Sequence, residues 1–452
     1  MKKIEKEQMG NYIKRTLHIA WPSVLESFFM AVMNIMDTYM VSAVGSAAVA
    51  AVGLTLQPRL LTWAVFMAMN VAVSALVARR RGENDREDAN RVMLMALLFS
   101  VIAAAFIAIV CVSFARQILQ LCGAQQDTLG MAASYFKITM VGLFFMAVSW
   151  MINAAQRGSG KTKISMITNI TSNVVNIILN YLLITGHMGF PAWGVKGAAA
   201  ATVIGNGCAA LLSIFSLFSR DNFLSIFYII KKKIRPTLEP VSIMVKLGGS
   251  VFLEQILMRI GFMLTAVMAA KLGTNDFAAH QVCMSILTFS FAFGDGMQVA
   301  AVALIGQSLG QKEPERAKIY GMLCRKIGLI MSIILGIIYI VFGRLIFQQF
   351  FEEQSIVDTG VSVVPVIIFT ILFQICQVIY NGCLRGAGDV VYVTVTCTIS
   401  ATFIRTLVSY LGGYVLGLGL IGIWFGIFAD QFSRAVFSTI RFRQGKWTQI
   451  HI

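Results

Sequence analysis

Two acidic residues interrupt an apolar segment near the start of the chain. Glu26 and Asp37 lie eleven residues apart in WPSVLESFFMAVMNIMD. That is about three helical turns, so both side chains would fall on roughly one face of a helix. An ionised carboxylate at the centre of a bilayer costs about 2.5–3.5 kcal/mol on insertion scales. Acids kept at that cost are candidates for binding an ion or a substrate.

The composition indicates that the helix carrying these acids crosses a membrane. The chain has 452 residues, of which 57% are hydrophobic and 13% are charged, whereas soluble domains average about 25% charged residues. Apolar stretches of the roughly 20 residues needed to span a bilayer recur throughout. We therefore predict an all-α integral membrane protein with twelve transmembrane helices. These spans are expected near residues 16–41, 51–78, 92–114, 129–152, 164–186, 197–219, 243–270, 278–306, 327–345, 360–384, 391–413 and 417–437.

The basic residues predict an orientation and a location. The net charge is +16, which could suggest nucleic acid, but most Lys and Arg fall in alternate loops. The loops or span ends on the other side hold Arg116, Lys196, Lys271 and Arg344. This asymmetry follows the positive-inside rule. It predicts a multi-pass protein of the plasma (inner) membrane with both termini cytoplasmic, the lipid bilayer as its surroundings and no nucleic-acid partner.

The chain repeats itself at a fixed offset. Four pairs of residues differ by 228 positions: Glu26 and Glu254, Gly45 and Gly273, Gly82 and Gly310, Asn153 and Asn381. We predict two six-helix bundles related by a pseudo-twofold axis, with an N-terminal lobe at 1–219, a cytoplasmic linker at 220–242 and a C-terminal lobe at 243–452. Duplicated bundles around a central site are typical of alternating-access carriers.

Several motifs have a structural interpretation instead of a catalytic one. AAQRGSGKT at 154–162 resembles a phosphate loop, but it follows a membrane helix and not a strand. We expect an inner turn there, with Arg157 and Arg385 facing the anionic leaflet. The four histidines show no metal-ligand spacing, and no hydrolase motif occurs. The sequence thus predicts neither an enzyme nor a bound cofactor.

Polar residues inside the spans fall into two groups. Asp430 and Arg434 are spaced to pair on one helix, Arg405 needs an acid or a water-filled space, and Asp295 is either structural or functional. Amides at helical spacing form two stripes, which can either join helices or line a polar cavity. The stripes are Asn173, Asn176 and Asn180, and Gln374, Gln377 and Asn381.

Ordered, duplicated motifs give the chain a resemblance to a known family over essentially its full length. They are MDTYMVSAVGSAAVAAVG at 36–53, LVARRRGENDREDA at 76–89, NAAQRGSGKTK at 153–163, AAKLGTNDFAAHQV at 269–282, LIGQSLGQ at 304–311 and NGCLRGAGD at 381–389. With these motifs the chain resembles the multidrug and toxic compound extrusion (MATE) family. That resemblance implies a cation-coupled antiporter of organic compounds, many of them cationic.

The resemblance also implies roles for particular residues. Glu254 resembles an acid of the NorM-like branch that is implicated in binding the coupling ion and the substrate. The resemblance therefore implies that Glu254 could be a ligand of a Na⁺ site. Asp37 resembles the acid of the family's MDT motif, and Asn176 and Asn180 match a polar pair. Two positions depart from the pattern, because Asn180 replaces an aspartate of the DinF-like branch and Gln374 replaces one of the NorM-like branch.

These residues predict an exchange mechanism. We expect H⁺ or Na⁺ to compete with small organic substrates for Glu254, Asp37 and Glu26, assisted by the amides of Asn176, Asn180, Gln374 and Asn381. We expect the protein to function as a monomer. Two alternatives stay open: a flippase for a lipid-linked sugar, which should need a strongly basic cavity, and a channel or receptor without ion-coupled transport.

Overall fold

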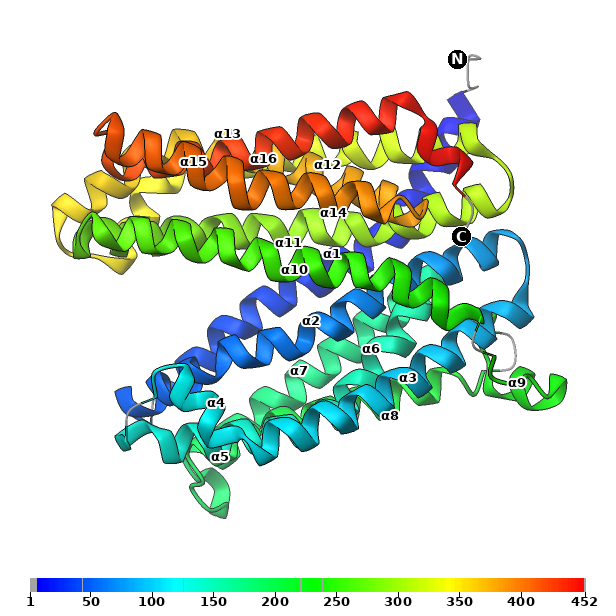
Figure 1. The fold of residues 1–452 in the computed structure, drawn as a ribbon, viewed down its shortest axis with the longest axis horizontal. Helices are drawn as coiled ribbons and strands as arrows, with labels where there is room; N and C mark the ends of the chain where they lie inside the picture. The colour runs from blue at the N-terminus through cyan, green and yellow to red at the C-terminus, as the bar shows by residue number, and fades with distance from the viewer. Residues whose placement is uncertain (1–5, 43, 125, 220–221, 238, 451–452) are drawn as a thin grey trace. The chain divides into compact units, whose positions relative to one another are not determined.

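The protein is helical throughout the part of the chain that the structure describes. The computed structural model describes residues 6–42, 44–124, 126–219, 222–237 and 239–450 (Figure 1). Within them, eleven helices are long and apolar enough to cross a membrane. The count becomes twelve when α5 (Gln126–Val141) and α6 (Leu143–Gly158), which are bent by 44° at their junction, form one span. The predicted all-α fold class is confirmed.

Contacts within the chain divide it into two compact units. The N-terminal unit is Phe29–Gly248, and the C-terminal unit joins Met1–Phe28, as far as described, to Gly249–Ile452. Helices α1 (Lys6–Ser42) and α10 (Glu239–Lys271) therefore each belong partly to one unit and partly to the other. The lobes predicted at 1–219 and 243–452 follow the sequence repeat, which is a different division of the chain.

The N-terminal unit is a bundle in which α7 packs along α8, and α6 packs against α2, α3 and α8 (Figure 1). Gly142 stands at the bend between α5 and α6, where a Cβ atom would lie 2.5 Å from the Val203 side chain. The remaining elements are α2 (Ser46–Gly82), α3 (Arg86–Ser113), α4 (Ala115–Leu121), α7 (Thr162–Ile184), a 3-10 turn (His187–Gly189), α8 (Val195–Ser216) and α9 (Ile226–Lys232).

In the C-terminal unit, α13 is the central helix, because it packs against α11, α12 and α16. Its neighbours are held close by small residues, so the buried polar groups of different helices come within hydrogen-bonding distance. The elements are α11 (Thr274–Gly310), α12 (Pro314–Phe350), α13 (Gln354–Gly386), α14 (Val390–Thr398), a π-helix (Ile399–Ile404), α15 (Arg405–Tyr410), a second π-helix (Leu411–Val415), α16 (Gly419–Gln444) and a 3-10 turn (Lys446–Gln449).

The repeat seen in the sequence is also a repeat of helix boundaries. Helices α2 and α11 begin and end 228 residues apart, and so do the starts of α3 and α12. The turn glycines Gly160 and Gly388 have φ values of +88° and +90°, a left-handed conformation that favours glycine. The same turn chemistry therefore ends α6 in one half and α13 in the other.

We predict that one glycine of α10 is needed for a close helix–helix approach. A Cβ atom on Gly261 would lie 2.1 Å from the carbonyl oxygen of Ala401, whereas one on Gly249 of the same helix meets nothing within 4 Å. Gly261→Ala should lower the free energy of unfolding by about 1–3 kcal/mol, because overpacking forces the backbones apart. Gly249→Ala should be neutral or stabilise by up to about 1 kcal/mol through helix propensity. Unfolding in detergent followed by circular dichroism measures both, and equal effects would contradict the close approach.

Candidate functional site

Asp37 lies in a cluster of amide side chains in the N-terminal unit. The Asn180 amide nitrogen donates to the Asp37 carboxylate at 2.8 Å. With the Asn176 amide turned by half a rotation, its nitrogen donates to the same oxygen at 2.8 Å and its oxygen accepts from the Thr202 backbone N–H. Neutral donors hold this carboxylate without cancelling its charge, so it can still take up a proton or another cation.

A cation also lies in the neighbourhood of Asp37. The Arg59 guanidinium donates to the Tyr135 hydroxyl at 2.9 Å and lies over the Trp63 ring, 4.8 Å from its centroid. From there it interacts electrostatically with Asp37. Aromatic contacts of this kind hold a guanidinium in place. The sequence showed only that Arg59 lies inside a span. The structure shows that it packs on aromatic rings and interacts with Asp37.

Glu254 is held by a charged partner, unlike Asp37. Arg385 donates to one carboxylate oxygen at 2.6 Å, and the Thr394 hydroxyl donates to the other at 3.4 Å. The side chain of Glu254 is 2% exposed and that of Arg385 is 10% exposed. Helices α10, α13 and α14 thus meet at one carboxylate. Its negative charge is balanced by a protein cation, as buried charges require.

The expectation for Arg385 was wrong. It was predicted to face the anionic leaflet, yet its guanidinium is buried and turned to Glu254. Its repeat equivalent Arg157 is half-buried and donates to Ser165 and Asn70. Both arginines belong to an RG turn motif that the sequence does reveal. The partner of Arg385 could not be found from sequence, because α10 and α13 lie far apart along the chain.

The amide stripe of α13 joins helices on one side of the C-terminal unit. Asn381 donates to Gln377 at 2.8 Å and to the Cys397 sulfur at 3.3 Å. Gln377 in turn donates to Gln431 of α16 at 3.1 Å. Gln374 is also buried, but its side-chain oxygen has no hydrogen-bond partner among the described residues. Asn381 lies one turn before Arg385, so the stripe leads to the Glu254 pair.

Glu26 is buried in the part of α1 that belongs to the C-terminal unit, where its side chain is 5% exposed. The next residue, Ser27, donates to the carboxylate of Asp295 on α11 at 3.1 Å. Asp295 therefore makes a hydrogen bond between helices, one of the two roles expected for it. Both repeat-related acids, Glu26 and Glu254, fall in the same unit.

A second buried carboxylate in the C-terminal unit binds two arginines. Asp430 accepts from Arg434 at 2.6 and 2.8 Å, which confirms the pair predicted from spacing. It also accepts from Arg405 at 3.4 Å, and Arg405 donates to Thr265 at 3.1 Å. Asp430 is thus the acid that Arg405 was expected to need. The cluster joins α10, α15 and α16.

We predict that this cluster stabilises the C-terminal unit. Asp430→Asn leaves two buried guanidiniums without their counter-charge, which should cost about 3–5 kcal/mol. The control is Asp358→Asn, because Asp358 is exposed and pairs with the exposed Arg344 at 2.9 Å. There the loss should be about 1 kcal/mol or less. Unfolding midpoints in detergent measure both, and an equal loss in the two variants would show that burial of the cluster is unimportant.

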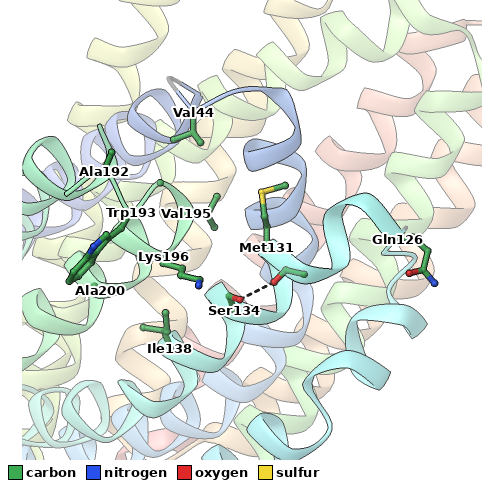
Figure 2. Close-up of a pocket in the computed structure, with 12 residues that line it drawn as sticks. Val44, Gln126, Met131, Ser134, Ile138, Ala192, Trp193, Val195, Lys196 and Ala200 are labelled. Carbon is green, nitrogen blue, oxygen red and sulfur yellow. Dashed lines mark hydrogen bonds between the residues drawn. The ribbon is translucent and has the colours of Figure 1, made fainter. Parts of the chain in front are cut away.

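A cavity of about 1030 Å³ opens on the N-terminal unit (Figure 2). It lies between α5 and α8, with Met131 and Ser134 on one side and Val195 and Lys196 on the other (Figure 2). Its size suits a drug-sized molecule. None of the predicted site residues is among those drawn there, and the Lys196 ammonium would repel an organic cation. The buried carboxylates are therefore the stronger candidates for cation exchange.

Comparison with known proteins gives one family. Its model, described as MatE, matches the chain twice, at residues 22–182 and 251–411. The chain is similar to a "Probable multidrug resistance protein NorM" of Thermotoga maritima, with 24% identity over 98% of this chain and 95% of that protein. A protein of the same name from Bacillus cereus is 27% identical over 83% of this chain and 82% of its own length. The family model thus matches two separate segments of the chain.

Solved structures give the same fold. One is described as the outward-facing conformation of a multidrug resistance MATE family transporter of the MOP superfamily. It superposes with a TM-score of 0.89 at 22% identity, covering 99% of this chain and 100% of that one. A MATE crystal structure in the bent conformation gives a TM-score of 0.87 at 22% identity, covering 98% and 99%. At this identity the likeness establishes the fold.

Proposed function

The chain belongs to the MatE family of multidrug efflux transporters, and from that premise we propose that it is a secondary active antiporter. It exports small organic compounds, mainly amphipathic cations, in exchange for H⁺ or Na⁺ by alternating access. The observation that carries this proposal is the buried pair of Glu254 and Arg385, at 2.6 Å. A carboxylate matched by one cation at a time can exchange that cation for another.

The exchange follows from the electrostatics of burial. A carboxylate in a dry setting is stable only when a positive charge or a proton neutralises it. Arg385 fills that role at Glu254 in this structure. A proton on Glu254 would loosen Arg385, and a cationic substrate would compete with both. When the coupling ion binds Glu254 from one side of the membrane and the substrate binds it from the other, the result is antiport.

Asp37 provides a second exchange group in the N-terminal unit. Its hydrogen bonds come from the amides of Asn180 and, in the turned orientation, Asn176. These neutral donors leave Asp37 more available to an incoming cation than the arginine-bound Glu254. We propose that Asp37 and Glu254 bind the transported cations, with Glu26, Gln374 and Asn381 as supporting polar groups.

The ligand sets favour a proton as the coupling ion. Na⁺ prefers several oxygen ligands, as other hard cations do. At Glu254 the contacts besides the carboxylate are a guanidinium and the Thr394 hydroxyl. Such a set suits protonation of the carboxylate better than coordination of Na⁺. We propose H⁺ at Glu254 and keep Na⁺ as the alternative that the experiment distinguishes.

The location and the oligomeric state of the protein belong to the same proposal. The chain is a multi-pass membrane protein. We propose that it lies in the plasma membrane with both termini on the cytoplasmic side, because its Lys and Arg residues follow the positive-inside rule. We propose that a single chain carries out transport, because both carboxylate sites are complete within it. The flippase alternative loses support, because Arg385, Arg405 and Arg434 are already matched to acids of the chain.

Proteoliposomes loaded with ethidium, a fluorescent organic cation, test the proposal under an imposed H⁺ or Na⁺ gradient. We expect one gradient to drive release by the native protein, and the effective gradient names the ion. Asp37→Asn and Glu254→Gln should each reduce the initial rate at least about tenfold, since removing a group that acts as a unit with its partners abolishes exchange. Gradient-independent or absent release by the native protein would overturn the proposal.

Controls separate transport from folding. Asp358→Asn removes an exposed acid paired with Arg344 at 2.9 Å, and should leave the rate unchanged. Glu254→Gln strands a buried guanidinium, so the double variant Glu254→Gln with Arg385→Gln restores charge balance. If the double variant folds like the native protein and still fails to transport, the pair of Glu254 and Arg385 is needed for exchange and not only for stability.

A further inference from the structure

Asp295 of α11 stands where three helices meet. It lies between two glycines in the sequence FGDGM. A Cβ atom on Gly296 would lie 2.4 Å from the Val24 Cα of α1, and one on Gly294 would lie 3.5 Å from the Val378 side chain of α13. The backbone of α11 is thus in close contact with α1 on one side and with α13 on the other. Asp295 lies between the two glycines that make these contacts.

Arg385 of α13 binds one carboxylate and interacts electrostatically with a second, on a different helix. It donates to Glu254 of α10 at 2.6 Å, and it also interacts electrostatically with Asp295. Asp295 meanwhile accepts a hydrogen bond from Ser27 of α1 at 3.1 Å. An arginine side chain is long and carries five donors, so a turn about its side-chain bonds can redirect it to a neighbouring acceptor.

We infer that Asp295 is the second acceptor for Arg385. Through Asp295, binding of the coupling ion at Glu254 affects helix α1. When the coupling ion neutralises Glu254, the guanidinium turns to Asp295. Its arrival draws the carboxylate away from Ser27. This inference rests on the proposed exchange at Glu254. It makes Asp295 a positioning residue, which acts on transport through Arg385 and Ser27.

The other groups near Glu254 are poorer destinations for the released arginine. Arg434 of α16 and Cys397 of α14 also interact electrostatically with Glu254. Arg434 is a cation already bound twice to Asp430, at 2.6 and 2.8 Å, and Cys397 offers a weakly accepting sulfur. A guanidinium left unpaired in this interior would cost several kcal/mol. Asp295 supplies the carboxylate that removes this cost.

Helix α1 extends from the C-terminal unit into the N-terminal unit, so the turn of Arg385 to Asp295 can affect both. Ser27 lies beside Phe28, the last residue of α1 in that unit, and Phe29 begins the N-terminal unit. Phe28 packs edge-on against Phe289 of α11, with ring centroids 5.2 Å apart. Asp37 follows Ser27 on the same helix by ten residues, about 15 Å. A change at Ser27 therefore acts on the helix that carries the second exchange group.

Two substitutions on either side of the hydrogen bond test this inference. Asp295→Asn removes the second acceptor, so Arg385 stays on Glu254, and the half-saturating concentration of the coupling ion should rise at least about fivefold. Ser27→Ala removes one donor that competes with Arg385 for Asp295, so that concentration should fall. Ethidium transport in proteoliposomes against a series of ion concentrations gives both values.

The opposite directions of the two shifts distinguish a switch from ordinary packing damage. Shifts in the same direction, or no shift in either variant, overturn the inference. If Asp295→Asn does not fold, Ser27→Ala decides alone, and an unchanged ion dependence overturns it. A native protein without gradient-driven transport, or a Glu254→Gln variant that transports normally, would instead show that the proposed exchange at Glu254 has failed.

Discussion

The matching of buried charges is the constraint on which the C-terminal unit depends. Several of its charged side chains are buried. A buried carboxylate must meet a cation, and a buried guanidinium must meet an acid. Glu254 meets Arg385, and Asp430 meets Arg405 and Arg434. These contacts bring α10, α13, α15 and α16 together at two points. In the mechanism proposed above, the pair of Glu254 and Arg385 that joins two of these helices is also the one that an incoming ion separates.

The acids of the two units have different hydrogen-bond partners. In the N-terminal unit, Asp37 is bound by amide donors and interacts electrostatically with Arg59. In the C-terminal unit, Glu254 is bound directly by Arg385. An amide-bound carboxylate keeps its charge for a ligand, whereas an arginine-bound one must first lose its partner. In the proposed mechanism, the two acids therefore differ in how readily an incoming cation can reach them.

Close backbone approach makes this charge matching feasible. Gly261 lets α10 approach the π-helical segment of the span that carries Arg405, and Gly296 lets α11 approach α1. Larger residues would separate the helices and lengthen the hydrogen bonds between them. The π-helical turns on both sides of α15 occur in the same span, and π-helices are frequent at functional sites.

The sequence by itself determined the helical membrane fold, the duplication at offset 228, the acids Glu26, Asp37 and Glu254, and the pairing of Asp430 with Arg434. These follow from apolar length, from repetition and from spacing within one helix, all of which are local in the chain. Only the tertiary structure decided that Arg385 binds Glu254, that Arg405 binds Asp430, and that α1 is shared by two contact units. The reason is physical: partners on different helices are chosen by the packing of those helices, and residue spacing carries no information about it.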